Sequence, residues 1–126
     1  MATVKSYTDL KQSKRLAEIL PHESADAFYD SAEPEKRQKP IVGSPDEYLD
    51  MEDWAIPCWS LAALLNVIPK HIKDYNVLRI DISNDFAIWY DEIGSGVNND
   101  LPNITMESAV DACYEMILKL HELKAL

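Results

Sequence analysis

The segment that decides the fold is Asn76-Val-Leu-Arg-Ile-Asp-Ile-Ser-Asn-Asp-Phe-Ala-Ile-Trp-Tyr-Asp-Glu92, which holds two runs of alternating apolar and polar residues. A period of two residues is typical of β-strands that are buried on one face. The three-residue loop Ser83-Asn84-Asp85 places the apolar side chains of both runs on the same face. The segment therefore predicts a β-hairpin over about 76–92. The predicted pairs are Ile82 with Phe86, Ile80 with Ile88, Leu78 with Tyr90 and, on the opposite face, Arg79 with Trp89.

Residues 58–68 precede this hairpin and are apolar nearly all round. They are good helix formers, Pro57 suits the first turn of a helix, and Pro69 stops it. A helix without a polar face must be covered by other elements in a globular protein. We therefore expect this helix at the centre of the core.

Two further segments have the period of amphipathic helices. Residues 105–124 carry the clearest apolar stripe of the chain, and Thr105 is placed to cap them. Residues 9–20 show the same pattern after Thr8, another candidate cap, and Pro21 ends it. The stripe predicted for the C-terminal helix consists of Met106, Ala109, Val110, Cys113, Met116, Ile117, Leu120 and Leu123.

The length of 126 residues and the content of 47% hydrophobic and 27% charged residues favour one globular domain over residues 1–126. The order of the segments predicts an α+β fold with a small antiparallel sheet that helices cover on one face. In this fold the sheet holds the hairpin at about 76–92 and an extra strand at about 24–30, and the helices lie at about 9–20, 58–68 and 105–124.

The charge of the chain is strongly negative. Lys and Arg number 12 against 22 for Asp and Glu, so the formal net charge is −10 at pH 7. Such a chain repels phosphate backbones and anionic lipids. Direct binding to nucleic acid and to membranes is therefore disfavoured.

The low number of cysteines and the absence of long apolar stretches favour a cytoplasmic location. The longest uncharged stretch runs from Trp54 to Pro69 and is shorter than the roughly 20 apolar residues of a membrane-spanning helix. The first residues hold no apolar core of signal-peptide length. Cys58 and Cys113 are the only cysteines, too few for a disulfide scaffold, so we expect two free thiols.

Residues 31–53 are predicted to form an acidic surface loop with a short helix that Ser44, Pro45 and Glu47 initiate. Aromatic residues alternate with carboxylates at the end of this segment, a pattern suited to docking on a basic partner. The alternative, favoured for the aromatic residues, is that they pack into the core of the protein itself. The candidate partner-binding residues are Asp46, Glu47, Tyr48, Asp50, Glu52, Asp53 and Trp54.

Cys58-Trp59 offers a second hypothesis, because a Cys-Trp pair at the start of a helix resembles the nucleophile of papain-like peptidases. A cysteine-dependent hydrolase would use Cys58 as the nucleophile and His71, just beyond the same helix, as the base. Free cysteines are among the most buried residues, so packing in the core is the favoured interpretation of Cys58.

No metal or cofactor is predicted. Asp81, Ser83, Asp85 and Glu92 match positions of a calcium-binding loop, but Phe86 stands where that loop needs glycine. The three histidines are not paired at ligand spacing.

Four segments of the chain resemble a family of short acidic proteins from gut anaerobic bacteria and their mobile or phage-like elements. These segments are 6–21, 24–26, 57–69 and 110–121, and residues 31–53 and 83–104 lie outside the resemblance. The resemblance implies an accessory or phage-related role in the cytoplasm and carries no catalytic residue to this chain.

The sequence as a whole favours a non-enzymatic protein-interaction module whose acidic surface meets a basic protein partner. An inhibitor that imitates the charge of DNA is one form of such a module. The alternative from another class is the hydrolase based on Cys58.

Overall fold

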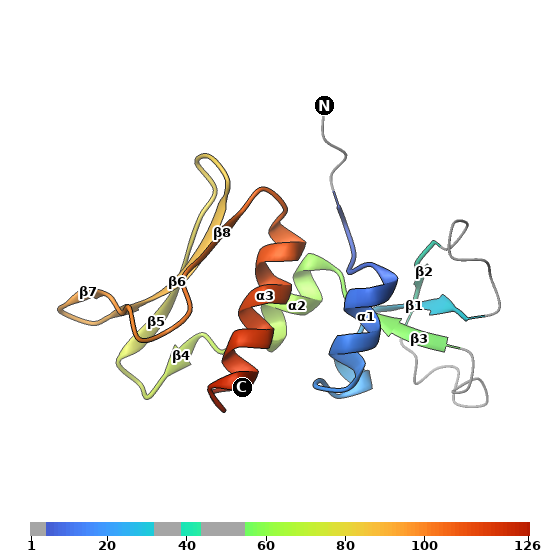
Figure 1. Cartoon of the computed structure of the whole chain (residues 1–126), viewed down its shortest axis with the longest axis horizontal. Coiled ribbons are helices and arrows are strands. Elements are labelled where there is room, and N and C mark those ends of the chain that lie inside the picture. The colour runs from blue at the N-terminus through green and yellow to red at the C-terminus, as the bar shows by residue number, and fades with distance from the viewer. Residues whose placement is uncertain (1–4, 32–38, 44–54) are drawn as a thin grey trace. The chain divides into compact units, whose positions relative to one another are not determined.

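The computed structural model describes residues 5–31, 39–43 and 55–126. These residues form three α-helices, one 3-10 turn and eight β-strands in two antiparallel sheets (Figure 1). The α+β class predicted from the sequence is confirmed. The chain divides into two compact units, of which one covers residues 6–64 and the other holds Lys5 and residues 65–126.

The unit of residues 6–64 contains a three-stranded antiparallel sheet. The extra strand expected at about 24–30 is present, but it pairs with β2 and β3 rather than with the hairpin. It therefore belongs to a sheet that the sequence did not predict. In sheet order the strands are β2 (Ile41–Val42), β1 (Ala27–Asp30) and β3 (Ala55–Cys58).

Helix α1 (Leu10–Ala17) packs against β3 and confirms the first predicted helix in a shorter form. Its cap is Asp9, whose side chain accepts a hydrogen bond from the Gln12 N–H at 2.8 Å, while the Gln12 side chain accepts one from the Asp9 N–H at 3.0 Å. Thr8 is buried instead of capping the helix. A 3-10 turn, η1 (His22–Ser24), leads from this helix towards β1.

The helix predicted at 58–68 is shorter than expected, because α2 spans only Leu61–Val67. The residues before it form β3, in which Pro57 lies opposite Phe28 of β1. Proline lacks an N–H group and fits a strand only where no ladder bond is needed, and β3 is the edge strand of its sheet. Cross-strand pairing with β1 therefore replaces the expected first helical turn.

The unit that holds residues 65–126 contains the predicted hairpin in a five-stranded antiparallel sheet, with the order β4-β5-β6-β7 and β8 also paired with β6. Helix α3 (Ala109–Glu122) packs on β6 and β8 (Figure 1). The strands are β4 (His71–Ile72), β5 (Asn76–Asp81), β6 (Phe86–Glu92), β7 (Gly96–Val97) and β8 (Ile104–Met106).

The register of the hairpin confirms the predicted pairs Leu78 with Tyr90, Arg79 with Trp89 and Ile80 with Ile88. The fourth predicted pair, Ile82 with Phe86, is wrong. The ladder ends at the pair of Asp81 and Ala87, and Phe86 pairs with Met106 of β8. Ile82 lies in the loop, where the Asp81 side chain accepts the Ser83 N–H at 2.7 Å and closes the turn.

The C-terminal helix begins later than predicted. Residues 104–106 pair with β6 as strand β8, and Ser108 rather than Thr105 caps α3 by accepting the Asp111 N–H at 3.2 Å. The apolar stripe of the helix is confirmed at Val110, Cys113, Met116, Ile117 and Leu120, all of which are buried. At the two ends of the predicted stripe, Met106 belongs to β8 and Leu123 is exposed.

Only one face of the five-stranded sheet is buried. Phe86, Ile88 and Tyr90 point to the same side as Ile104 and are covered by α3. We call this side the inner face and the opposite side the outer face. Side chains alternate along a strand, so Trp89 points to the outer face.

Among the described residues, no helix is long and apolar enough to cross a membrane.

Candidate protein-interaction surface

The acidic segment singled out from the sequence lies outside the described residues. This applies to the partner-binding candidates Asp46, Glu47, Tyr48, Asp50, Glu52, Asp53 and Trp54, and to the short helix expected from Ser44.

Cys58 is fully buried at the end of β3, and Cys113 is fully buried in α3. Both are free thiols, as expected. Burial, with a smaller contribution from the Asp26 carboxylate, raises the pKa of Cys58 from 9.0 to about 12. The thiol is therefore protonated at neutral pH, whereas a cysteine nucleophile must be an accessible thiolate.

The surroundings of Cys58 are structural. The Asp26 carboxylate accepts hydrogen bonds from the Ser60 N–H at 2.9 Å and from the Ser60 hydroxyl, and the Ser60 hydroxyl oxygen in turn accepts the Ala63 N–H at 3.2 Å. This chain of contacts ties β1 to the first turn of α2. His71, the proposed base, is an exposed residue of β4 in the other unit. The packing interpretation of Cys58 is the one that these contacts support.

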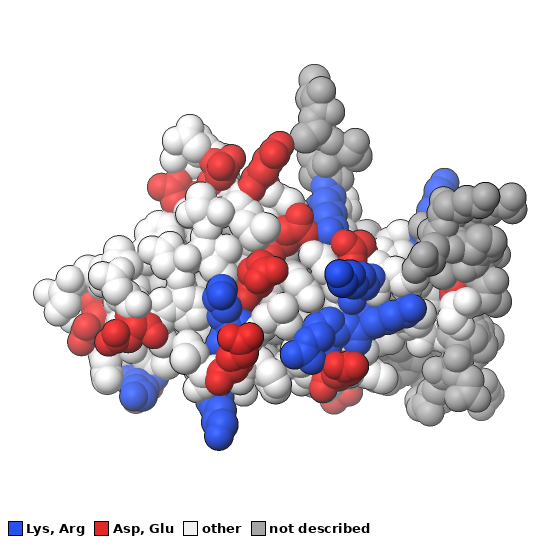
Figure 2. Space-filling view, viewed as in Figure 1, with Lys and Arg blue, Asp and Glu red and all other residues white. Residues whose placement is uncertain are grey.

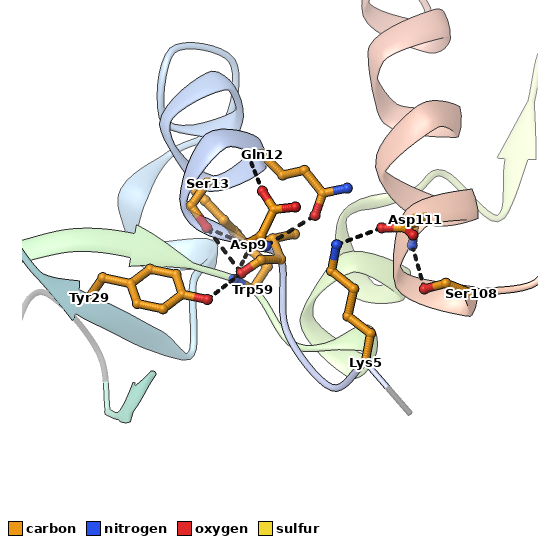
Figure 3. Close-up of polar contacts among 9 residues, drawn as sticks. Lys5, Asp9, Gln12, Ser13, Tyr29, Trp59, Ser108 and Asp111 are labelled. Carbon is orange, nitrogen blue, oxygen red and sulfur yellow. Dashed lines mark hydrogen bonds and ion pairs between the residues drawn. The ribbon is translucent and has the colours of Figure 1, made fainter. Parts of the chain in front are cut away.

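A second cluster of buried polar groups surrounds Thr8. The Thr8 hydroxyl lies 2.7 Å from the Ser13 hydroxyl and accepts the backbone N–H of Trp59 at 3.1 Å, and the Thr8 carbonyl accepts the Tyr29 hydroxyl at 2.7 Å (Figure 3). These contacts join the segment before α1 to β1 and β3. Every polar group named here has a partner, so the cluster holds the unit together and presents nothing to a ligand.

The outer face of the five-stranded sheet is the surface that remains. The residues that point to it alternate with the buried ones, and in this unit no described helix lies over it (Figure 1). By register, the outer face consists of His71 and Val97 at one end, Val77, Arg79 and Asp81 of β5, Ala87, Trp89 and Asp91 of β6, and Thr105 of β8.

Trp89 is held in place at the centre of the outer face. Its indole N–H donates to one oxygen of Asp91 at 2.8 Å, and the other oxygen of Asp91 lies 3.3 Å from the Arg79 Nε. Asp91 thus bridges a tryptophan and an arginine that lie opposite each other on neighbouring strands. Tryptophan and arginine are the residue types most enriched at the energetic centres of protein interfaces.

Acidic side chains lie at both ends of the hairpin (Figure 2). Asp81 and Asp85 flank the β5–β6 loop, and Asp74 and Glu92 lie near the opposite end. Hydrogen bonds from the Ser83 backbone and side chain lower the pKa of Asp81, so its carboxylate stays ionised at neutral pH. The unit carries ten acidic against six basic side chains, a net charge of −4 with neutral histidines.

Basic side chains gather instead on α1 of the other unit (Figure 2). Lys11, Lys14 and Arg15 are exposed there, and Arg15 pairs with Glu18 at 3.0 Å. By sequence, residues 6–64 nevertheless hold twelve acidic against six basic side chains, so the net charge of this unit is −6.

The sequence predicted that Arg79 lies opposite Trp89 on the outer face, as the structure shows. The prediction missed the role of Asp91, although the spacing of Trp89 and Asp91 by two residues on one strand already puts both on one face. Among the described residues, no group of three or more metal-ligating side chains comes together. Of the residues in the calcium-loop pattern, Asp81 accepts the Ser83 N–H within the hairpin turn.

Comparison of the chain with protein-family models, curated proteins and solved structures gave no match.

Proposed function

We propose that the protein is a non-enzymatic interaction module of the bacterial cytoplasm that binds a basic protein partner through the outer face of its five-stranded sheet. The observation that carries the proposal is the arrangement of Trp89, Asp91 and Arg79 on a sheet face that no described helix of its unit covers. The resemblance to short acidic proteins of gut anaerobes supports an accessory or phage-related role for such a module.

The arrangement supports binding because the large side chains are already oriented. Fixing a flexible side chain on binding costs about 0.5–1.5 kcal/mol, and the hydrogen bond of Trp89 to Asp91 removes part of that cost in advance. Apolar residues accompany Trp89 on the outer face: Val77 and Ala87, which are half-buried, and Val97, which is exposed. Such apolar neighbours keep water away from a central contact.

Charge supports a basic partner. Arg79 is neutralised by Asp91, and Asp81 remains as an ionised carboxylate on the same face. The net charge of −4 on this unit adds an attractive field for a cationic protein, which raises the rate of association more than the final affinity. A nucleic-acid-binding protein is one class of partner with the required charge.

The test uses fluorescence anisotropy with a labelled peptide of alternating lysine and leucine, and the corresponding glutamate peptide as the opposite charge. The full-length protein should bind the lysine peptide, bind it less tightly as NaCl increases, and ignore the glutamate peptide. Trp89→Ala should weaken binding at least tenfold. Tyr114→Ala is the matched control, because Tyr114 is a half-buried aromatic residue of α3, the helix that packs on the inner face of the same sheet.

Trp54→Ala tests the acidic segment separately. Loss of binding in Trp54→Ala with full binding in Trp89→Ala would refute the outer face and assign binding to residues 46–54. Equal binding of the lysine and glutamate peptides would refute the basic partner.

A further inference from the structure

The outer edge of β5 carries a second, independent feature. On the β4 side, pairing of β5 covers only Asn76 and Val77, and the Leu78 N–H donates to the Lys70 carbonyl at 2.9 Å. Backbone groups in an antiparallel ladder point alternately to the two sides of a strand. The N–H and C=O of Ile80 therefore point to the same side as those of Leu78, away from β6.

Beyond Leu78, no described residue pairs with this edge. The side chains next to it are apolar and accessible, since Ile80 is 42% exposed and Ile82 is 74% exposed. Helix α3 covers β6 and β8 but leaves this row uncovered. Edge strands of stable proteins are normally protected by charged side chains, lysine above all, by proline or by a bulge. Between Leu78 and Ile82 this edge has no lysine, proline or bulge, and its two charges, Arg79 and Asp81, are of opposite sign.

The sequence of the edge is complementary to itself. Leu78-Arg79-Ile80-Asp81-Ile82 alternates apolar residues with one positive and one negative charge. If a second β5 lies antiparallel to the first with Ile80 opposite Ile80, each Arg79 faces the Asp81 of the other copy, and Leu78 faces Ile82. Opposite charges on facing positions stabilise a sheet, and like charges destabilise it.

We propose that two copies of this chain associate through their β5 edges, in an antiparallel pairing centred on Ile80 that joins the two five-stranded sheets. The charge complementarity of Arg79 and Asp81 selects a second copy over other strands. A two-fold axis at Ile80 makes the contact isologous and closes it at a dimer.

The geometry predicts a short and therefore weak interface. Within residues 78–81, only Ile80 offers both its N–H and its C=O to a second copy, because the backbone groups of Arg79 and Asp81 point to β6 and the Lys70 carbonyl already occupies the Leu78 N–H. The Arg79 guanidinium has five N–H donors, so its contact with Asp91 leaves donors for the Asp81 carboxylate of a second copy. The association needs no basic partner, so the proposed dimer and the proposed function can be tested independently of each other.

Sedimentation velocity of the full chain from about 5 µM to 1 mM tests the proposal. The native protein should change from monomer to dimer within this range. Ile82→Lys should raise the dissociation constant at least tenfold, because it places a lysine on the edge. Ile93→Lys is the matched control: Ile93 is 65% exposed on the same unit but follows β6, so dimerisation should be unchanged.

Charge reversal identifies the register. Asp81→Arg and Arg79→Asp should each remain monomeric, because like charges then face each other in the pair. An equimolar mixture of the two variants should form a heterodimer, since every facing pair is again of opposite sign. Circular dichroism of each variant checks that it is folded.

A native protein that stays monomeric at 1 mM would overturn the proposal. So would a dimer that persists in Ile82→Lys, or folded charge variants whose mixture does not associate.

Discussion

Replacing Thr8 with valine tests what holds the unit of residues 6–64 together. Thr8 is fully buried, and its hydroxyl lies 2.7 Å from the Ser13 hydroxyl and accepts the Trp59 N–H at 3.1 Å. Valine has nearly the same shape as threonine, so Thr8→Val removes the hydroxyl while opening almost no cavity. The change in stability then measures the polar contacts themselves.

The expected cost follows from which groups lose a partner. The buried N–H of Trp59 loses its acceptor, which costs about 1–3 kcal/mol. The Ser13 hydroxyl loses less, because it can still donate to the Thr8 carbonyl at 3.4 Å. We expect Thr8→Val to lower the free energy of unfolding by about 2 kcal/mol.

The assay is equilibrium unfolding in urea, followed by circular dichroism and by tryptophan fluorescence. Thr8→Ser is the matched control, since it keeps the hydroxyl and loses one methyl group, at a cost of about 1 kcal/mol. A double-mutant cycle with Ser13→Ala isolates the contact between the two hydroxyls, and its coupling energy should be about 0.5–1.5 kcal/mol.

Stability of Thr8→Val equal to or above that of Thr8→Ser would refute the reasoning. It would mean that the methyl group, rather than the hydrogen bonds, makes the contribution of Thr8.

Three further predictions concern the buried thiols and the cap of α3. Cys58 and Cys113 should not react with Ellman's reagent at pH 7.5 in the folded protein and should both react after unfolding; a fast-reacting thiol in the folded protein would contradict the burial of both. The pKa values of both thiols rise from 9.0 to about 12 and that of Tyr29 from 10.0 to about 12 on folding, chiefly through burial. Above pH 9 the unfolded chain therefore loses protons that the folded chain keeps. The free energy of unfolding measured in urea should fall by up to about 1.4 kcal/mol per pH unit for each group. A free energy of unfolding that stays constant from pH 9 to 10.5 would contradict this prediction. Ser108→Ala should lower the unfolding free energy by about 1 kcal/mol through loss of the cap, whereas Ser95→Ala in an exposed turn should change it little in the same urea titration.

The local pattern of the sequence was sufficient for the hairpin and for the core stripe of α3. Three of the four predicted pairs of the hairpin are present, because the alternation of apolar side chains allows only one register with a buried face. The C-terminal stripe is confirmed in its central positions, where spacing by three and four residues leaves one face for burial.

The candidate site was predicted only in part. The pair of Arg79 and Trp89 follows from the register, but its bridging carboxylate, Asp91, was not recognised. The accessible β5 edge was also not predictable from the hairpin alone, because it depends on how far β4 extends along β5.

The sequence by itself therefore determined the α+β class, the hairpin register and the burial of both cysteines, because these depend on the order and spacing of apolar residues over short distances. Tertiary structure decided where the remaining segments pair. Residues 55–58 are apolar enough for a helix or a strand, and the facing β1 made them strand β3. Residues 104–106 became strand β8 because β6 offered a free edge. Both outcomes depend on partners distant in the chain, which local periodicity does not encode.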